Sequence, residues 1–293
     1  MDELVLLAIK ADDEGLLAGE EPKQRAFKNV IRILQDLGVE GVPLTGKMSP
    51  EIVKRVHRAN QRLFRPVDMQ EGGVHLGLFM YRDLFASLYV PYILGSPEVD
   101  FWKLLDFSDD QKRWVASDSN ALATFEDQCL DLLDFGYGYM EFGHTRPVND
   151  YAKELIYRAH VQLESAAATA TAAFDYRGTL QGALLGTELA LKAGLAANGH
   201  DEESLRTNFG HNLTKAAKKL GNLEPNFDAD RVESVVSDFP DFVQSRYSGQ
   251  LPTRKEIGHI VMKAQFVASE VTRQFTDRNI RSQQSRAATR SYP

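Results

Sequence analysis

The sequence predicts a mainly α-helical protein, in which an acidic helical module over residues 1–145 precedes an up-and-down helical bundle over 146–277. Two observations support this fold class. Apolar residues recur at helical intervals over several long segments, and no segment of useful length alternates apolar and polar residues with the period of a strand. We expect residues 278–293, which carry four arginines and no acids, to form a flexible basic tail.

The composition is that of a globular protein. The chain has 293 residues, 43% of them hydrophobic and 26% charged, enough for one large or two ordinary domains. A single cysteine, Cys129, excludes an internal disulfide and a cysteine-based zinc site. The sequence starts with Met1-Asp2-Glu3, which is acidic where a secretory signal would be basic. The most apolar stretch, residues 75–94, is interrupted by the charged pair Arg82-Asp83, which argues against a membrane-spanning helix. We therefore expect a soluble cytoplasmic protein with no membrane partner.

The charge is unevenly distributed along the chain. The formal net charge is −7, which provides no general attraction to nucleic acid. Residues 1–145 carry 15 basic and 24 acidic side chains, whereas residues 146–293 carry 19 and 17. We therefore expect an anionic partner to meet the second half, and we leave the role of the first half open between sensing a signal, binding a protein partner and restraining activity.

Helix signals are clearest in parts of the first half. The expected helices cover 27–37, 50–65 and 122–132. Gly38 ends the first, and Ser49-Pro50-Glu51 starts the second with an N-cap, a proline at the first helical position and an acid in the first turn. The aromatic stretches 89–102 and 135–142 are broken by glycine or proline, and no structure is predicted for them.

The helical pattern becomes more regular after a boundary expected at 143–147. Four bundle helices follow, over 152–173, 179–197, 213–220 and 253–275. The first carries mostly small residues at alternating intervals of four and three, namely Ala152, Ile156, Ala159, Leu163, Ala166, Ala170 and Ala173. Such a stripe would let a neighbouring helix approach closely. Asn198-Gly199 is expected to end the second bundle helix.

Three short motifs follow in a characteristic order. They are Thr187-Glu188-Leu189-Ala190-Leu191-Lys192-Ala193, Gly210-His211-Asn212-Leu213 and Ser245-Arg246-Tyr247. Together with the helices around them, they make residues 147–277 resemble the HEPN domain, a helical bundle of prokaryotes and higher eukaryotes. Two departures from the family pattern are Asn212, where aspartate is more frequent, and Ser248, where proline often stands.

The resemblance implies an activity on RNA. Many HEPN proteins are metal-independent endoribonucleases whose motif places an arginine a few residues before a histidine. They act as dimers that bring two copies of the motif together, so the resemblance implies a homodimer here, formed through the long helices. Arg206 and His211 match that spacing, although Thr207 is not the polar residue that usually follows the arginine. The chemistry suits the pair, with His211 as general acid and base and Arg206 as a clamp on the scissile phosphate. The setting that the resemblance implies is cellular stress or antiviral defence.

The spacing alone restricts how the pair can act. Side chains five residues apart diverge by roughly 140° on an unbroken helix, so Arg206 must lie in a loop or a second subunit must contribute. A second match, Arg254 and His259, is interpreted as two solvated residues at a helix start. Chance alone produces about one such match in a chain of this composition, so spacing proves nothing.

Other residues admit two interpretations. In the simpler interpretation, Glu188 and Lys192, which are four residues apart, form an ordinary ion pair on one face of a helix. In the other, an anionic ligand such as RNA or a nucleotide is bound by Lys192, Lys215, Arg246 and Tyr247. The protein would then be a catalytically silent binding module. A third possibility is a structural protein in which the bundle only assembles subunits.

Two further patterns are rejected. Residues 41–48 imitate a phosphate-binding loop, but Met48 replaces the Ser or Thr that would bind magnesium, and a helix precedes the segment. Glu141 and His144 have a metal-ligand spacing, but the surrounding glycines argue against a continuous helix. We therefore expect no metal ligands and no cofactor.

Overall fold

The computed structural model of the chain is mainly helical with one small antiparallel hairpin. The residues that it describes are 2–42, 50–64, 74–91, 99–172, 176–247, 252–283 and 290–293. The expected phosphate-loop imitation at 41–48, the N-cap Ser49 and the departure at Ser248 lie wholly or largely outside them. Within the described ranges, no helix combines the length and apolar character needed to cross a membrane.

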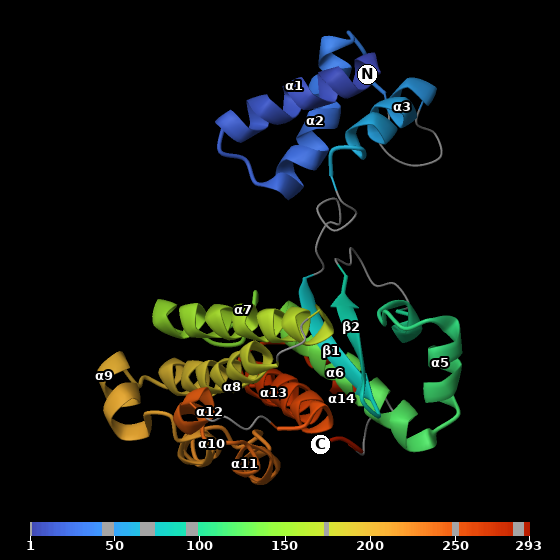
Figure 1. The fold of residues 1–293 in the computed structure, drawn as a ribbon. Helices are drawn as coiled ribbons and strands as arrows, with labels where there is room; N and C mark the ends of the chain where they lie inside the picture. The colour runs from blue at the N-terminus through green and yellow to red at the C-terminus, as the bar shows by residue number, and fades with distance from the viewer. Residues whose placement is uncertain are drawn as a thin grey trace. The chain divides into compact units, whose positions relative to one another are not determined.

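The chain divides into two compact units, Met1–Gly72 and Gly73–Pro293. The first contains α1 (Glu3–Leu17), α2 (Pro22–Asp36) and α3 (Glu51–Asn60) (Figure 1). These helices enclose a core of their own, formed by Leu4, Val5, Ala8, Ala11, Val30, Ile33, Leu34, Val53, Val56 and Ala59. The expected boundary at 143–147 lies inside the second unit, where the Gly143 amide donates to the Phe275 carbonyl at 2.9 Å.

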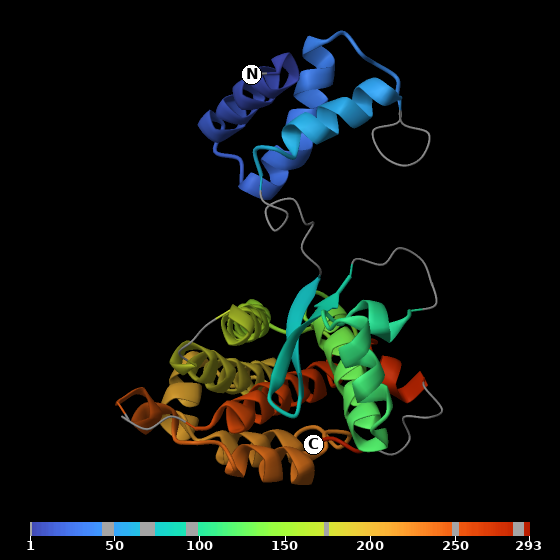
Figure 2. The same ribbon diagram turned by 45° about the vertical axis from the view of Figure 1, so that its right-hand side comes forward.

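The second unit is built mostly from helices. Its elements after the hairpin are η1 (Phe101–Lys103), α5 (Asp109–Ala116), α6 (Ser119–Gly138), α7 (Asp150–Ala172), α8 (Arg177–Ala197), α9 (Glu202–Ser204), η2 (Leu205–Phe209), α10 (Leu213–Gly221), α11 (Ala229–Ser237), α12 (Phe242–Tyr247), α13 (Arg254–Arg273) and α14 (Ile280–Gln283). Helix α8 packs against both α7 and α13, and α13 also packs against α6 (Figures 1 and 2). The expected helices of the second half are thus present.

The small residues on α7 allow the close packing that was predicted. The stripe from Ala152 to Ala170 is buried throughout. Opposite it, a Cβ added to Gly186 of α8 would lie 2.8 Å from Leu163 Cγ, and one added to Gly182 would lie 3.0 Å from the Gln162 carbonyl oxygen. The two helices therefore leave no space for a side chain at Gly182 or Gly186 of α8.

A β-hairpin that the sequence analysis did not predict precedes α5. Strands β1 (His75–Tyr81) and β2 (Leu84–Val90) pair in register from His75 opposite Val90 to Tyr81 opposite Leu84. Most residues on both faces of the hairpin are buried, because it contacts α6, α7 and α13. Two buried faces remove the alternation of apolar and polar residues by which a half-exposed strand is recognised.

The expected flexible tail is attached to the second unit wherever it is described. Helix α14 packs against α6. Further on, the Ser291 and Tyr292 amides donate to Asp127 at 2.8 and 2.9 Å, and Arg290 pairs with the buried Asp131. Two of the tail arginines, Arg281 and Arg290, therefore pair with Asp127 and Asp131 of α6, which a local charge count does not reveal.

Candidate functional site

The motif around His211 lies where α8, η2 and α10 meet. Element η2 is a π-helical turn, in which the Gly210 amide donates to the Leu205 carbonyl at 3.2 Å. Gly210 then adopts a φ of +52°, a conformation that side-chain-bearing residues seldom adopt. Asn212 caps α10 by accepting from the Lys215 amide at 2.8 Å. This sequence of turn and cap places His211 next to α8.

Glu188 of α8 binds two cationic or titratable side chains at once. Its Oε2 lies 2.8 Å from His211 Nδ1, and its Oε1 accepts from Lys192 Nζ at 2.6 Å. Glu188 is 7% exposed and Lys192 is 15% exposed, whereas His211 is 54% exposed. The predicted helical ion pair is therefore present, and it forms the buried base of a site whose accessible member is an imidazole.

Arg206 is held by a different carboxylate. It lies in the π-helical turn, and its guanidinium contacts Glu203 Oε1 and Oε2 at 2.8 to 3.2 Å. Both partners are strongly exposed. The turn does interrupt regular helix between Arg206 and His211, as their spacing required. Nevertheless, the structure pairs Arg206 with Glu203 and His211 with Glu188, so the two side chains are not joined through one acid.

The expected ligand-binding residues surround this site unequally. Lys215 Nζ donates to the Asn208 carbonyl at 2.5 Å and lies 5.7 Å from the Phe209 ring centre. Arg246 and Tyr247 belong to α12, which packs against α8, but their side chains lie outside the described residues. The His211 ring lies 5.2 Å from that of Phe242, also in α12. Helix α12 therefore forms a wall of the site.

The second arginine-histidine match has structural partners. Arg254 Nε donates to the Asp83 carbonyl at the hairpin turn at 2.6 Å, and the guanidinium lies 4.2 Å from the Phe85 ring centre. His259 Nδ1 lies 3.0 Å from the Tyr292 hydroxyl. These contacts secure the hairpin and the C-terminal residues, so they give the second match a structural explanation rather than two freely solvated side chains.

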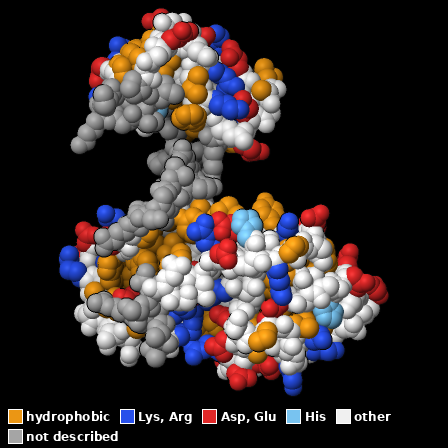
Figure 3. Space-filling view, turned by 180° about the vertical axis from the view of Figure 1, so that it is seen from behind, with side chains coloured by type: hydrophobic (Ala, Val, Ile, Leu, Met, Phe, Trp, Pro, Cys, Tyr) orange, Lys and Arg blue, Asp and Glu red, His pale blue; other side chains and the backbone are white. Residues whose placement is uncertain are grey.

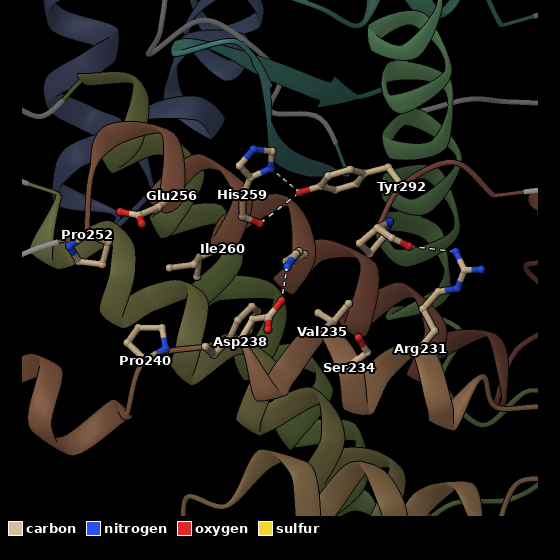
Figure 4. A pocket seen from close by; sticks show the side chains of 13 residues that line it. Arg231, Ser234, Val235, Asp238, Pro240, Pro252, Glu256, His259, Ile260 and Tyr292 are labelled. Carbon is tan, nitrogen blue, oxygen red and sulfur yellow. Dashed lines mark hydrogen bonds and ion pairs between the residues drawn. The ribbon is translucent and has the colours of Figure 1, made fainter.

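A cavity of about 740 Å³ opens between α11, α13 and the C-terminal residues. Figure 4 shows the His259 ring of α13 pointing toward Tyr292 of the C-terminal residues, whereas Asp238, at the end of α11, lies on the opposite side of the view. Burial lowers the pKa of His259. The lining is mostly apolar and includes neither Arg206 nor His211 nor any of the expected ligand-binding residues. The site around His211 is therefore separate from this cavity.

The face drawn in Figure 3 has no large area of basic side chains in the second unit. There, the basic side chains of the second unit are interspersed with acidic ones. The cations in the elements around the His211 site are Arg206, Lys192 and the lysines of α10. The formal net charge of −7 provides no general attraction to a polyanion, so these local cations would have to bind it.

Two groups of possible metal ligands lie elsewhere in the second unit, one of them considered in the sequence and one not. Glu141 binds Arg278 through two 2.6 Å contacts that lower the pKa of its carboxyl group, which explains its position without a metal. In contrast, His75, His160 and Glu164 bring three ligand atoms within 4.8 Å of one another. The spacing of His160 and Glu164, four residues apart on a helix, was the signal that could have revealed this cluster.

Comparison of the chain with known protein families, with curated proteins and with solved structures found no match. Function is therefore inferred from the residues and their geometry.

Proposed function

We propose that residues 147–277 form a HEPN-like module and that the protein cleaves RNA without a metal ion, with His211 as the general acid and base. The observation that carries the proposal is the 2.8 Å contact between His211 Nδ1 and the nearly buried carboxylate of Glu188. A buried carboxylate that orients an accessible imidazole is a recurrent arrangement in acid-base catalysis.

The contact selects one form of the imidazole. A carboxylate accepts hydrogen bonds, so Nδ1 carries the hydrogen that bonds Glu188. In the neutral ring, Nε2 then holds the lone pair that can take a proton from a ribose 2′-hydroxyl. Because His211 is half exposed, a strand of RNA can reach this nitrogen without rearrangement of the core.

The reaction that fits these groups is transfer within the RNA backbone. The 2′-oxygen bonds to phosphorus as its proton passes to His211, and the bond from phosphorus to the 5′-oxygen breaks. A proton returned to that oxygen gives a 5′-hydroxyl and leaves a 2′,3′-cyclic phosphate. Arg206 first releases Glu203 and then binds the phosphate, where it stabilises the negative charge. The exchange is easy, because an exposed ion pair contributes at most about 1 kcal/mol.

The test is cleavage of single-stranded RNA in EDTA, with the products identified by mass spectrometry. The unaltered protein should produce cyclic phosphate ends, and His211→Ala should lower the rate at least about 100-fold. His144→Gln, which alters an exposed histidine elsewhere in the second unit, should retain the rate. Unchanged cleavage by a folded His211→Ala protein would remove His211 from the mechanism.

One observation favours a second candidate, a module that binds RNA or a nucleotide without cleaving it. Arg206 is paired with Glu203 rather than placed beside His211. Such a module would bind RNA with an affinity that falls with salt, would weaken on Lys192→Ala, and would yield no cleaved product. Binding and cleavage measured on the same RNA distinguish the two candidates.

A further inference from the structure

A second cluster of titratable groups lies away from His211, between the hairpin and α7. His75 is the first residue of β1, and His160 and Glu164 lie one turn apart on α7. His75 Nδ1 lies 2.9 Å from His160 Nδ1 and 3.8 Å from Glu164 Oε1. His160 Nε2 lies 3.4 Å from Glu164 Oε2. Each residue thus offers a ligand atom to the same small volume.

The surrounding residues hold these side chains in place. The Tyr139 ring stacks on His160 at 3.9 Å between centres, and Phe135 meets the His75 ring edge-on at 5.0 Å. The Leu76 amide donates to Glu164 Oε1 at 3.0 Å. Ligands that are already oriented by packing and by a hydrogen bond to the carboxylate are typical of metal sites.

Both histidines are interior residues. His75 is fully buried and His160 is 6% exposed. Imidazole nitrogens are frequent ligands of zinc and other transition metals, so two of them beside a carboxylate form a donor set suited to such an ion.

The two histidines are an unusual pair for a protein core. Only one of the two facing Nδ1 atoms can donate a hydrogen to the other. His75 Nε2 is buried without a hydrogen-bond partner among the described residues, and an ion bound at Nδ1 would leave that nitrogen as it is. Burial of two imidazoles costs free energy that apolar side chains at these positions would not cost, because apolar side chains have no polar atom to leave unpaired.

We propose that His75, His160 and Glu164 bind one Zn²⁺ ion that fastens the start of β1 to α7. Two imidazoles and one carboxylate are a preferred zinc ligand set, and water completes the coordination where Glu164 borders solvent. Bonds of about 2.1 Å at a tetrahedral angle place two nitrogens about 3.4 Å apart, so the two Nδ1 atoms must separate by about 0.5 Å and both rings must turn their lone pairs toward the ion.

The test is a titration of full-length protein, freed of metal by a chelator and then dialysed, with Co²⁺ followed by visible absorption and with Zn²⁺ in competition. One ion per chain should bind. His160→Gln and Glu164→Gln should each weaken binding at least about 10-fold. Zn²⁺ should raise the melting temperature of the unaltered protein but not that of either variant.

The control is His144→Gln, which should bind both ions as the unaltered protein does, because His144 is exposed and outside the cluster. Circular dichroism establishes that each variant is folded. Equal affinity of His160→Gln and the unaltered protein, or no stoichiometric binding by the unaltered protein, would overturn the proposal. EDTA in the RNA assay would also remove this ion, so circular dichroism in EDTA must show that the protein stays folded there. The zinc titration contains no RNA, so its failure is distinguishable from a failure of the proposed cleavage.

Discussion

Glu188 and His211 lie 23 residues apart in the chain but are joined by a 2.8 Å contact between a nearly buried carboxylate and a half-exposed imidazole. The same carboxylate binds Lys192 at 2.6 Å. Lys192, on the same helix, thus neutralises the buried Glu188 carboxylate, which can still orient the solvent-accessible His211 side chain. The proposed catalysis by His211 should therefore depend on Glu188.

Replacement of Glu188 by glutamine should lower the cleavage rate at least about 10-fold while RNA binding changes little, because the amide no longer fixes the protonated nitrogen of His211. The measurement is the turnover number at saturating RNA, with affinity determined separately. Glu154→Gln, on an exposed helical pair with Arg158, is the control. If Glu188→Gln retains full turnover in a folded protein, Glu188 does not position the histidine.

The exposed pair of Arg206 and Glu203 predicts opposite effects for its two members. Arg206→Ala should weaken RNA binding and slow cleavage, because a phosphate contact is lost. Glu203→Gln should strengthen RNA binding, because it releases the guanidinium and removes a negative charge. Neither change should alter the free energy of unfolding by more than about 1 kcal/mol. Parallel losses of RNA binding in both variants would contradict a phosphate clamp.

Asp131 should be critical for the stability of the second unit. It is fully buried and contacts Arg273 at 2.8 Å as well as Arg290. Burial opposes its charge, but these arginines lower its pKa overall. Asp131→Asn should lower the free energy of unfolding by about 3–5 kcal/mol, since it leaves buried arginines without a full counter-charge. Denaturation followed by tryptophan fluorescence measures the loss.

A surface acid provides the matched control for that measurement. Asp110 pairs with Arg113, and both are strongly exposed. Asp110→Asn should change the free energy of unfolding by less than about 1 kcal/mol. A similar loss in the two variants would mean that the buried arrangement around Asp131 contributes no special stability.

The close contact of α7 and α8 predicts different outcomes for two glycines of α8. A Cβ at Gly186 would lie 2.8 Å from Leu163 Cγ, whereas one at Gly178 would meet only Thr169 Cγ2 at 3.5 Å. Gly186→Ala should therefore destabilise the second unit by about 1–3 kcal/mol. Gly178→Ala should be neutral or stabilising by up to about 1 kcal/mol. Thermal denaturation of the two variants provides the comparison, and equal melting temperatures would contradict tight packing at Gly186.

Glu20 should make the first unit sensitive to acid. Hydrogen bonds from Arg32 at 2.8 Å and Lys28 at 2.9 Å lower the pKa of Glu20 from 4.5 to about 2. A lowered pKa in the folded state means that the stabilisation is complete above about pH 4.5 and is lost as the pH falls towards 2. Glu20→Gln should remove that part of the pH dependence.

The two units can be followed separately in the full chain. Both tryptophans, Trp102 and Trp114, belong to the second unit, so their fluorescence reports that unit alone, whereas circular dichroism reports both. Thermal denaturation between pH 2 and 5 should show a flatter pH dependence of the first unit in Glu20→Gln and an unchanged second unit. An identical pH dependence in the two proteins would exclude Glu20 as the source.

The helices were largely predictable because each carries its own signal. The stripe from Ala152 to Ala170 repeats with the period of a helix and is buried on α7. The capping box of α13, in which Thr253 and Glu256 bond each other's backbone, was not identified from the sequence, although the helix itself was. These signals are local, so they survive without knowledge of the neighbours.

The hairpin was not predictable by the same means. Two apolar runs of seven residues flank Arg82-Asp83, and this two-residue turn was the available signal. Arg82 has a φ of +60°, a conformation that glycine or asparagine usually adopts in such turns. Because neither residue is present here, the usual sequence signal of the turn is missing. Burial of both strand faces by α6, α7 and α13 is what makes these runs strands rather than helix.

The sequence by itself determined that this protein is mainly helical, where the bundle helices run, and that Glu188 and Lys192 share a helix face. Only the tertiary structure decided that His211 meets Glu188, that Arg206 meets Glu203, and that His75 joins His160 and Glu164. Periodicity and capping act over a few neighbouring residues, whereas a site depends on which distant segments the core packs side by side.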